Sequence, residues 1–379
     1  MLLSCVNTKK KKRKVSTLDE DSISMWLESR GTPLPNGRVT VSSSRTQSPP
    51  APGLGFERML ASTTTICHNI RQQPTQSPIP MPESFGIVIV ADLDKKSKDN
   101  SSKKPQFMSF IMHATLKVTS SSLRATSKRD KYSVVFGDET KFLSSMNEAG
   151  RGFELSELAW FGGKLLAFDD RTGIVYRLKH FESVSKSKPL QAIPEHIIME
   201  GDGINGKGQK HEWATVKDAI MDSNGDVHHE DWTANYGAVR KALGCEWPGY
   251  VVHEAIEWSP IRRQWFILPR RISTEKYNDM DDEKRGSNKF IIASEDFSSI
   301  QVHEVGKITP LRGFSSFKFV PRSDDSVIVA IKSVEVEVEQ HQTSYITVFD
   351  VDGNVLMEET EIPGAKKYEG VAFAHDWSS

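Results

Sequence analysis

The sequence has few cysteines and lacks long apolar runs, and both absences narrow the class of protein. Its three cysteines, Cys5, Cys67 and Cys245, are too widely separated to predict a disulfide framework or a zinc site. The longest apolar run, Phe85–Ala91, is far shorter than the ~20 residues that a membrane-spanning helix needs. Phosphate-binding glycine loops, dinucleotide fingerprints and a Ser-His-Asp arrangement are also missing. The sequence therefore has none of the common signatures of a membrane-spanning, zinc-binding or dinucleotide-binding protein.

The chain also has no large excess of positive or negative charge. The 379 residues carry 49 Lys and Arg against 50 Asp and Glu, for a formal net charge of -1. This balance argues against a protein that coats nucleic acid. Hydrophobic residues make up 37% of the chain, which is enough for the core of one large domain or two ordinary ones.

The first 82 residues differ in composition from the rest. They are rich in Ser, Thr, Pro, Gln and Arg and show little periodicity, which predicts a disordered segment over residues 1–82. A basic cluster at Lys9–Val15 is typical of nuclear import, although a solvated run of charge would have the same composition. We place the folded domain at residues 83–379.

A repeat organises this domain. Short apolar strands each carry one oxygen-bearing residue, and these residues are Ser156, Glu212, Glu254, Ser315 and Glu369. Their spacings are 56, 42, 61 and 54 residues. The interval after Ser315 divides into four strand-like stretches, at Phe314–Val320, Ser326–Lys332, Ser344–Asp350 and Asn354–Glu359. A first unit divides in the same way, at Leu155–Phe161, Lys164–Phe168, Gly173–Leu178 and His196–Glu200. Four antiparallel strands in each repeat predict an all-β propeller.

The ends of the domain predict how the ring closes. Tyr368–Phe373 is a lone final strand, and spare strands lie at the front, at Phe85–Asp92, Phe110–Val118 and Tyr132–Phe136. We therefore expect five blades, one of them shared by the N- and C-terminal segments. The interval of 42 residues is too short for a blade, so we expect an incomplete second blade with a segment missing between Asp218 and Asp226.

Several motifs together resemble the calcium-activated nucleotidase (apyrase) family. They are Ala91–Asp94, Gly152–Leu158, Phe168–Gly173, Gly201–Gly203, Glu212–Asp218, His229–Tyr236, Pro248–Tyr250, Leu268–Arg271, Gly313–Phe319 and Lys367–Gly370. The resemblance runs from about Phe85 to Phe373. It implies a five-bladed propeller with a central calcium and hydrolysis of nucleoside di- and triphosphates, with UDP and GDP favoured. It also implies that the protein lies in the secretory pathway. The basic cluster at Lys9–Val15 is instead typical of nuclear import.

The five repeat-marking residues match the calcium-lining positions of that family. Buried carboxylates are costly unless they are paired or bind a metal. Oxygen donors without nitrogen or sulfur fit Ca²⁺ better than Zn²⁺. The alternative is that each glutamate only hydrogen-bonds a neighbouring blade, but five such residues in register favour a metal.

Hydrolysis of a phosphoanhydride needs charge neutralisation and a positioned water. The basic candidates are Arg151, Arg171, Lys210, Arg270 and Arg271. Arg270 and Arg271 follow a proline at a strand end, which suits a fork that grips phosphate oxygens. We assign Arg151 to nucleotide binding and the Arg270–Arg271 pair to catalysis.

The acidic catalytic candidates are Asp92, Asp94, Asp169, Asp170 and Glu230. Asp92 and Asp94 share a face because alternate residues of a strand point the same way. They could accept the proton of the attacking water or hold a second, substrate-borne calcium. Asp169 and Asp170 also fit an ordinary hairpin turn.

Trp232 and Tyr236 precede or begin an apparent helix at Tyr236–Leu243. They could stack on the nucleotide base or pack against a blade.

The function that the sequence favours is calcium-dependent phosphate release by direct water attack. The alternatives are a catalytically impaired propeller that binds nucleotide or protein, and a lactonase-like propeller. The expected partner is a nucleotide, without nucleic acid or a membrane span, and a homodimer is one candidate assembly.

Overall fold

The structure is a computed structural model. It describes residues 2–4, 82–119, 131–182, 187–200, 204, 206–217, 230–336, 339 and 341–377. The expected disordered segment 1–82 and its basic cluster lie outside these residues, apart from Leu2–Ser4 and Pro82. The interval from Asp218 to Asp226 lies outside them as well. Within the described part of the chain, every helix is too short or too polar to span a bilayer.

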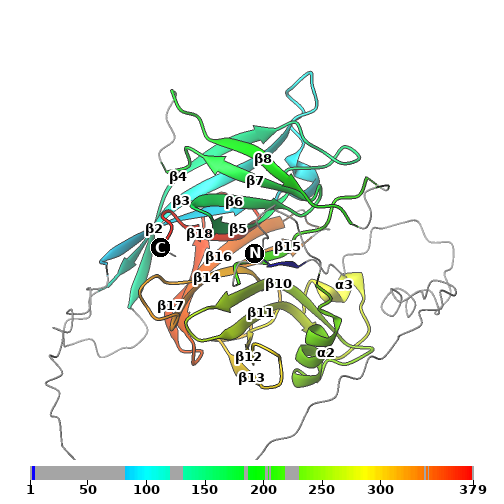
Figure 1. The fold of residues 1–379 in the computed structure, drawn as a ribbon, viewed down its shortest axis with the longest axis vertical. Helices are drawn as coiled ribbons and strands as arrows, with labels where there is room; N and C mark the ends of the chain where they lie inside the picture. Colours follow the sequence, from blue (N-terminus) through cyan, green and yellow to red (C-terminus); the bar gives the residue numbers. More distant parts are fainter. Residues whose placement is uncertain are drawn as a thin grey trace, which may run out of the picture. The chain divides into compact units, whose positions relative to one another are not determined.

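Three sheets each consist of four consecutive antiparallel strands (Figure 1). The first contains β5, β6, β7 and β8, at Leu155–Phe161, Lys164–Asp169, Ile174–Lys179 and Gln191–Ile197. The second contains β10, β11, β12 and β13, at Tyr250–Ser259, Gln264–Ser273, Lys289–Ser294 and Ile300–Glu304. The third contains β14, β15, β16 and β17, at Gly313–Phe319, Val327–Val336, His341–Asp350 and Val355–Ile362.

The fourth sheet combines strands from both ends of the domain. Its order is β18-β2-β3-β4, formed by Tyr368–Phe373, Ser84–Ala91, Phe107–Val118 and Tyr132–Ser144. A fifth, smaller sheet pairs β1 (Leu2–Ser4) with β9 (Trp213–Thr215) in antiparallel register. The described chain is therefore all-β, with four four-stranded blades in a propeller-like arrangement.

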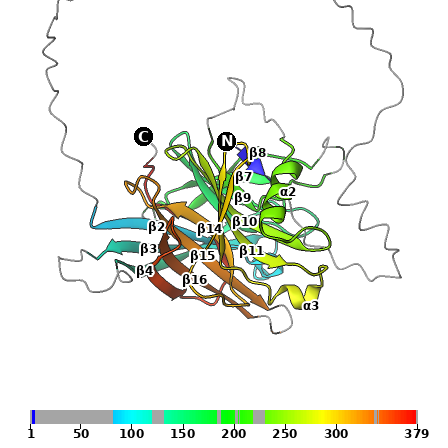
Figure 2. The same cartoon turned by 90° about the horizontal axis from the view of Figure 1, so that it is seen from below.

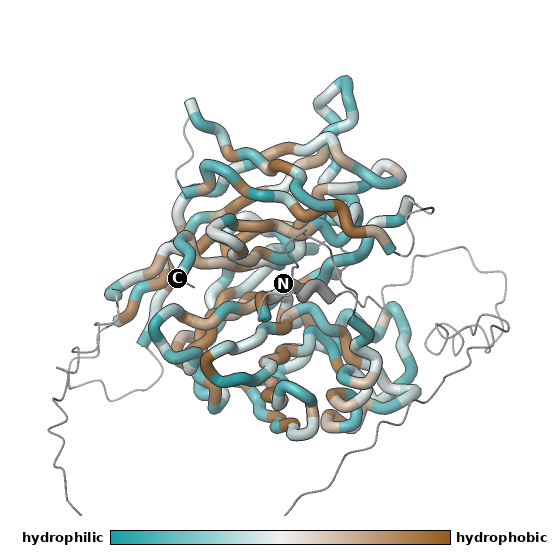
Figure 3. Tube along the Cα trace, viewed as in Figure 1, coloured by the Kyte–Doolittle hydropathy of each residue, from teal (hydrophilic) through white to brown (hydrophobic). Residues whose placement is uncertain are grey.

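The blades pack face to face because their strands are apolar on both sides. On β2, Ile87 and Ile89 join a hydrophobic cluster with the β14–β17 sheet, whereas Val88 and Val90 join a cluster with the β5–β8 sheet. The β2–β4 strands accordingly lie beside β14–β16 in both views (Figures 1 and 2). Hydrophobic residues follow the strands and hydrophilic residues follow many of the turns (Figure 3).

The short strand β9 lies between two blades. Trp213 packs in the cluster of the β10–β13 sheet, and Ala214 packs in a cluster with residues of the β5–β8 sheet. All three residues of β9 are buried. The two-stranded sheet thus fills the gap between these two four-stranded blades.

Most predicted strands are present within a few residues of their expected bounds, but one was displaced. The fourth strand of the first blade was expected at His196–Glu200, whereas β8 spans Gln191–Ile197. This outer strand is largely exposed and contains Pro194, so it carries little apolar signal.

Short helices complete the fold: η1 at Asp94–Ser97, α2 at Thr233–Ala242 and α3 at Asp279–Asp282. The helix expected at Tyr236–Leu243 is α2.

Candidate active site

The first strands of the sheets meet one another around the centre of the domain. β5 contacts β18, β18 contacts β14, β14 contacts β10, and β9 contacts both β10 and β5. Each of the strands β5, β10, β14 and β18 has an irregular register against its neighbour in the sheet. The irregularities fall at the residues that mark the repeat, namely Ser156, Glu254, Ser315 and Glu369. A β-bulge changes the direction of one side chain. Each of these four residues therefore combines an oxygen-bearing side chain with an irregularity in the strand.

All five repeat-marking residues are buried, with exposed fractions of 1–3%. The hydroxyl of Ser156 donates to the carbonyl of His211, which precedes Glu212. The hydroxyl of Ser315 lies 3.4 Å from the carbonyl of Tyr368, which precedes Glu369. The fold therefore brings these residues from separate blades next to one another.

The guanidinium of Arg270 connects two of these carboxylates. Its Nη1 donates to Oε2 of Glu254 at 2.5 Å and to Oε1 of Glu369 at 3.0 Å. Burial alone would lower the pKa of Arg270, but the charges of Glu254 and Glu369 raise it above its usual value. Lys210 has a similar position beside Glu212, at 2.5 Å from Oε1.

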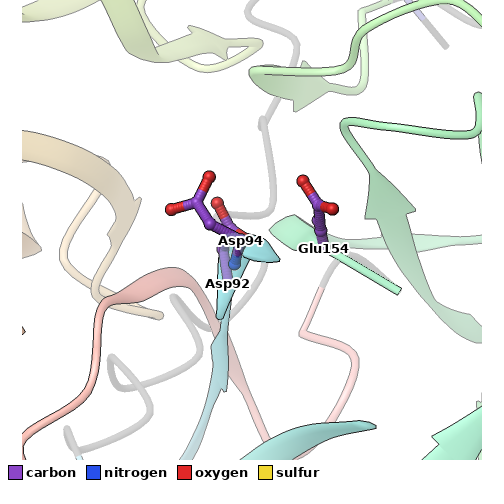
Figure 4. Close-up of side chains that lie close together, drawn as sticks. All are labelled: Asp92, Asp94 and Glu154. Carbon is purple, nitrogen blue, oxygen red and sulfur yellow. Dashed lines mark hydrogen bonds between the residues drawn. The ribbon is translucent and has the colours of Figure 1, made fainter. Parts of the chain in front are cut away.

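A second group of acids lies beside the first. Asp92, Asp94 and Glu154 bring carboxylate oxygens within 4.8 Å of one another, and Figure 4 shows the three side chains together. Among the described residues, none of the five predicted calcium residues belongs to this group. Asp92 follows β2, Asp94 opens η1 with a φ of 49°, and Glu154 immediately precedes β5. Ends of strands from two blades thus build one acidic centre.

Two basic side chains hold this acidic centre. Arg151 donates through Nε to Oε1 of Glu154 at 2.8 Å and through Nη2 to Oε2, in a two-point contact. The ammonium of Lys367, which is fully buried, lies 2.6 Å from Asp92 and 3.0 Å from Asp94. The same ammonium lies 3.2 Å from Glu369. Lys367 therefore links the acidic centre to the predicted calcium residues.

The acidic centre contains groups with altered proton affinity. Burial, followed by the charges of Asp170 and Asp92, raises the pKa of Glu154 to about 8. Burial and the adjacent Asp94 also raise the pKa of Asp92. A carboxyl group whose pKa lies near neutral pH, as that of Glu154 does, is suited to acid–base chemistry.

Asp169 and Asp170 have different surroundings. Asp169 accepts backbone N–H groups of Phe153, Arg171 and Thr172 at 2.8–3.1 Å, which is the turn role that the sequence also allowed. Asp170 instead accepts from Lys210 at 2.5 Å, and its Oδ1 has no hydrogen-bond partner among the described residues. Asp169 therefore stabilises a turn, whereas Asp170 pairs with a basic side chain, as the residues of the acidic centre do.

Arg270 and Arg271 point to different partners. Arg271 donates through Nη1 to Asp282, and Asp282 also accepts from the hydroxyl of Tyr250 at 2.7 Å. Neighbouring residues of β11 face opposite sides of the sheet. The two arginines therefore do not form the single fork that their sequence suggested. Arg171 pairs with Glu148.

The two aromatic candidates lie in the core. Trp232 packs against Trp213, Trp265 and Phe297, and its exposed fraction is 5%. Tyr236 accepts from the indole N–H of Trp213 at 3.3 Å and is 8% exposed. Both adopt the alternative in which they pack against a blade. Glu230 is exposed ahead of α2.

Comparison with known proteins identifies the chain. A family model described as Apyrase matches residues 93–221 and 219–374. An apyrase of Caenorhabditis elegans is 38% identical over 320 residues, covering 77% of this chain and 85% of the relative. The chain belongs to the apyrase family. It is accordingly a nucleotide-hydrolysing enzyme.

Two further relatives support this membership. The soluble calcium-activated nucleotidase 1 of Rattus norvegicus is 37% identical over 316 residues, covering 76% of this chain and 73% of the relative. An apyrase of Cimex lectularius is 37% identical over 319 residues, covering 76% and 82%. The two parts of the apyrase model meet at residues 219–221, inside the interval where the sequence predicts a missing segment.

Calcium fits the residues of this apyrase-family chain. The predicted ligands offer oxygen alone, and the three glutamates among them are at most 3% exposed. Burial, followed by the charges of Glu254 and Asp92, holds the pKa of Glu369 well above its usual value, although Lys367 and Arg270 oppose this. A divalent cation would relieve the same crowding of carboxylates.

Sequence reasoning missed Glu154 and Lys367. Each stands two residues before a repeat-marking residue, Ser156 or Glu369, as Lys210 does before Glu212. Glu154, Lys367 and Lys210 all lie just before a strand begins, so their shared feature is the recurring offset in the sequence. Charged residues at this offset were the signal that could have found both.

A second layer of charges was missed as well. Lys318 on β14 contacts Glu257 on β10 and lies 3.2 Å from Glu157 on β5. The hydroxyl of Ser316 donates to Glu157 at 2.9 Å, and Thr215 donates to Glu257 at 2.5 Å. This network joins strands from different blades without any residue that the sequence had marked.

Proposed function

We propose that this chain is a calcium-dependent hydrolase of nucleoside di- and triphosphates that releases inorganic phosphate. The observation that carries the proposal is the acidic centre of Asp92, Asp94 and Glu154, which lies against two basic side chains in a chain of the apyrase family. Phosphoanhydride hydrolysis needs this combination of acid–base groups and positive charge. UDP and GDP are the proposed preferred substrates.

The acids of the centre are proposed to orient the attacking water. Glu154 would accept the proton of that water once its own carboxyl group is deprotonated, and because its pKa is about 8, the deprotonated fraction and the rate should rise with pH up to about 8. The two-point contact with Arg151 fixes its carboxylate plane. No nucleophilic side chain is needed for this chemistry, so we propose direct attack of water on the terminal phosphorus.

Ser156, Glu212, Glu254, Ser315 and Glu369 are the proposed calcium residues. Bound calcium would supply a fixed double positive charge at the centre of the blades. Because its ligands come from different blades, the free energy of binding adds to the free energy of folding. Arg270 would hold Glu254 and Glu369 in place, as residues around metal ligands commonly do.

We also propose that the two-stranded sheet stands in place of a fifth blade. β9 carries Glu212 immediately before it and packs between the β5–β8 and β10–β13 sheets. With it, each of the five proposed calcium residues belongs to a different part of the ring. The compartment that we propose is the secretory pathway, where millimolar calcium suits weak binding sites.

Phosphate release from UDP, GDP and ADP tests the proposal. The purified full chain is assayed in millimolar calcium and again after calcium is removed with a chelator. We expect release that depends on calcium and returns when calcium is restored. Equal rates in both conditions would reject the calcium requirement.

One structural feature favours a second candidate function. Among the residues that the structure describes, the fifth sheet has two strands where the other four sheets have four. A chain impaired by this shortening would bind nucleotide as a scaffold. Nucleotide binding in calcium without phosphate release would establish that function instead.

A further inference from the structure

The connection between β2 and β3 carries a local excess of positive charge. Within residues 95–104, which we call the lysine loop, five lysines accompany one acid, Asp99. The chain as a whole has a net charge of -1, so the excess belongs to this loop and not to the protein in general. All five lysines are exposed, namely Lys95, Lys96, Lys98, Lys103 and Lys104.

The backbone of the lysine loop is fixed at several points. Ser97, the last residue of η1, is buried. Lys98 forms a β-bridge with Phe107, the first residue of β3, and the backbone N–H of Asp99 donates to the carbonyl of Gln106 at 2.8 Å. The lysines are therefore held at one place on the surface.

Neighbouring acids leave the charge of the loop largely uncancelled. Asp99 accepts from the ammonium of Lys141 on β4 at 2.9 Å, so a lysine outside the loop already pairs with it. Lys96 lies 3.5 Å from the side-chain oxygen of Gln342. Among the residues that the structure describes, the other four lysines of the loop form no ion pair.

The basic side chains of the acidic centre are in the opposite situation. Arg151 holds Glu154, and Lys367 holds Asp92 and Asp94. Charges that are matched in this way leave the centre little net positive charge with which to attract a polyphosphate from solution.

The lysine loop starts at the acidic centre. Asp94 opens η1, and Lys95 is the next residue. Since a residue extends the chain by at most ~3.6 Å, the Cα atoms of Asp94 and Lys98 are at most about 15 Å apart. The Debye length is about 10 Å in 0.1 M salt and about 30 Å in 0.01 M salt. The field of the loop therefore reaches the centre at low ionic strength.

We propose that the lysine loop attracts the polyphosphate of the nucleotide substrate towards the acidic centre and so lowers KM, without taking part in the chemistry. The inference rests on the proposed function and deepens it. Charge of one sign beside a site raises the local concentration of an oppositely charged ligand and speeds its association. Because the attraction grows with the charge of the ligand, it is stronger for a nucleoside triphosphate than for the diphosphate of the same base.

The test removes four charges from the loop and varies the salt. KM and kcat for UDP and UTP are measured in the same calcium at about 0.03 M and about 0.5 M ionic strength. At the lower value we expect KM for UDP to rise about 5- to 10-fold and KM for UTP to rise more, with kcat within about 2-fold of the wild type. At the higher value the two proteins should agree within about 1.5-fold, because salt screens the attraction. The substitutions are Lys95→Gln, Lys98→Gln, Lys103→Gln and Lys104→Gln.

The matched control removes four charges at the far ends of the strands. Lys117 lies ten residues beyond Phe107 on β3, which is about 33 Å at the rise of a strand. The other three lysines lie near the first residue of β4 and the last residues of β5 and β7. We expect KM of the control to stay within about 2-fold of the wild type at both salt concentrations. The control carries glutamine at the exposed residues Lys117, Lys131, Lys164 and Lys188.

A smaller change covers the case in which four substitutions disturb the loop. Lys103→Gln combined with Lys104→Gln leaves η1 intact, and we expect it to raise KM for UDP about 2- to 3-fold at low salt. Wild-type KM in both loop variants would overturn the inference. An increase in KM that persists at 0.5 M salt would overturn it too, because it would indicate direct contact and not long-range attraction.

A binding measurement separates this inference from the proposed function. Absence of phosphate release by the wild type would sink the proposed function. The affinity for α,β-methylene UDP, which resists hydrolysis, would then test the inference by calorimetry at the same two salt concentrations. We expect the four-lysine variant to bind the analogue about 5- to 10-fold more weakly at low salt. Equal affinities, or no binding by the wild type, would reject the role of the loop.

Discussion

Glu154 is the single residue from which we expect the largest effect on catalysis. Replacing it with glutamine keeps the shape of the side chain and removes the group that would accept a proton. We expect Glu154→Gln to lower the rate of phosphate release from UDP by at least about 100-fold, the usual range for a lost acid–base group. The measurement is kcat in saturating calcium.

The control for this prediction is Glu195→Gln. Glu195 lies on the outer strand β8 and pairs with Lys164 and Arg177, far along the sheet order from β5. Its rate should match the wild type. An unchanged kcat in Glu154→Gln would remove the acidic centre from the mechanism.

Glu157 leads to a prediction about pH. Burial, opposed in part by Lys318, holds its pKa at about 8 in the folded protein, whereas an unperturbed glutamate has a pKa of about 4.3. Between these two values, the folded protein keeps a proton that the unfolded chain has lost. The free energy of unfolding therefore falls as the pH rises from about 5 to about 8.

We expect Glu157→Gln to flatten this dependence, because glutamine does not titrate. Thermal unfolding in excess calcium between pH 5.5 and pH 9 measures it, and Glu195→Gln serves again as the control. The wild type and the control should lose stability with rising pH, whereas Glu157→Gln should lose less. Parallel curves for all three proteins would contradict the protonated state of Glu157.

At the scale of elements, the close approach of β18 to β5 depends on Gly370. A Cβ atom there would lie 2.9 Å from the backbone of Glu157. We expect Gly370→Ala to lower the free energy of unfolding by about 1–3 kcal/mol, the usual cost of overpacking. Urea denaturation gives this value.

Gly237 in α2 is the matched control for this effect. A Cβ atom at Gly237 would meet nothing within 4 Å, and alanine favours a helix by up to about 1 kcal/mol. Gly237→Ala should therefore be neutral or stabilising. If Gly370→Ala were equally harmless, the two strands would not be tightly packed at this point.

At the scale of the whole molecule, calcium should hold the blades together. Calcium at 100 times its dissociation constant would add about 2.7 kcal/mol to the free energy of unfolding. We expect Glu369→Gln to lose most of this increment, whereas Glu304→Gln, on the surface of the β10–β13 sheet, should keep it. Chemical unfolding with and without chelator measures the increment. Equal stability of the wild type in both conditions would exclude a structural role for calcium.

Much of the architecture could be predicted because it depends on local pattern. Apolar strands and polar turns recur at blade-length intervals, and the repeat-marking residues stand at the same place in each. The pairing of β18 with β2 followed from a lone strand that needed partners. The sequence also named Asp92 and Asp94 as candidates on the expectation that they alternate on one strand. That reason was wrong, because Asp92 follows β2 and Asp94 lies in η1, where its backbone N–H donates to Asp92 at 2.8 Å.

Only the tertiary structure decided which charges meet. Glu154 joins Asp92 and Asp94 from another blade, and Lys367 reaches both the acidic centre and Glu369. Arg270 and Arg271, adjacent in sequence, diverge to Glu254 and Asp282. Residue type and local periodicity determine strands and their faces, but contacts between blades depend on how distant strands pack, which no local pattern encodes.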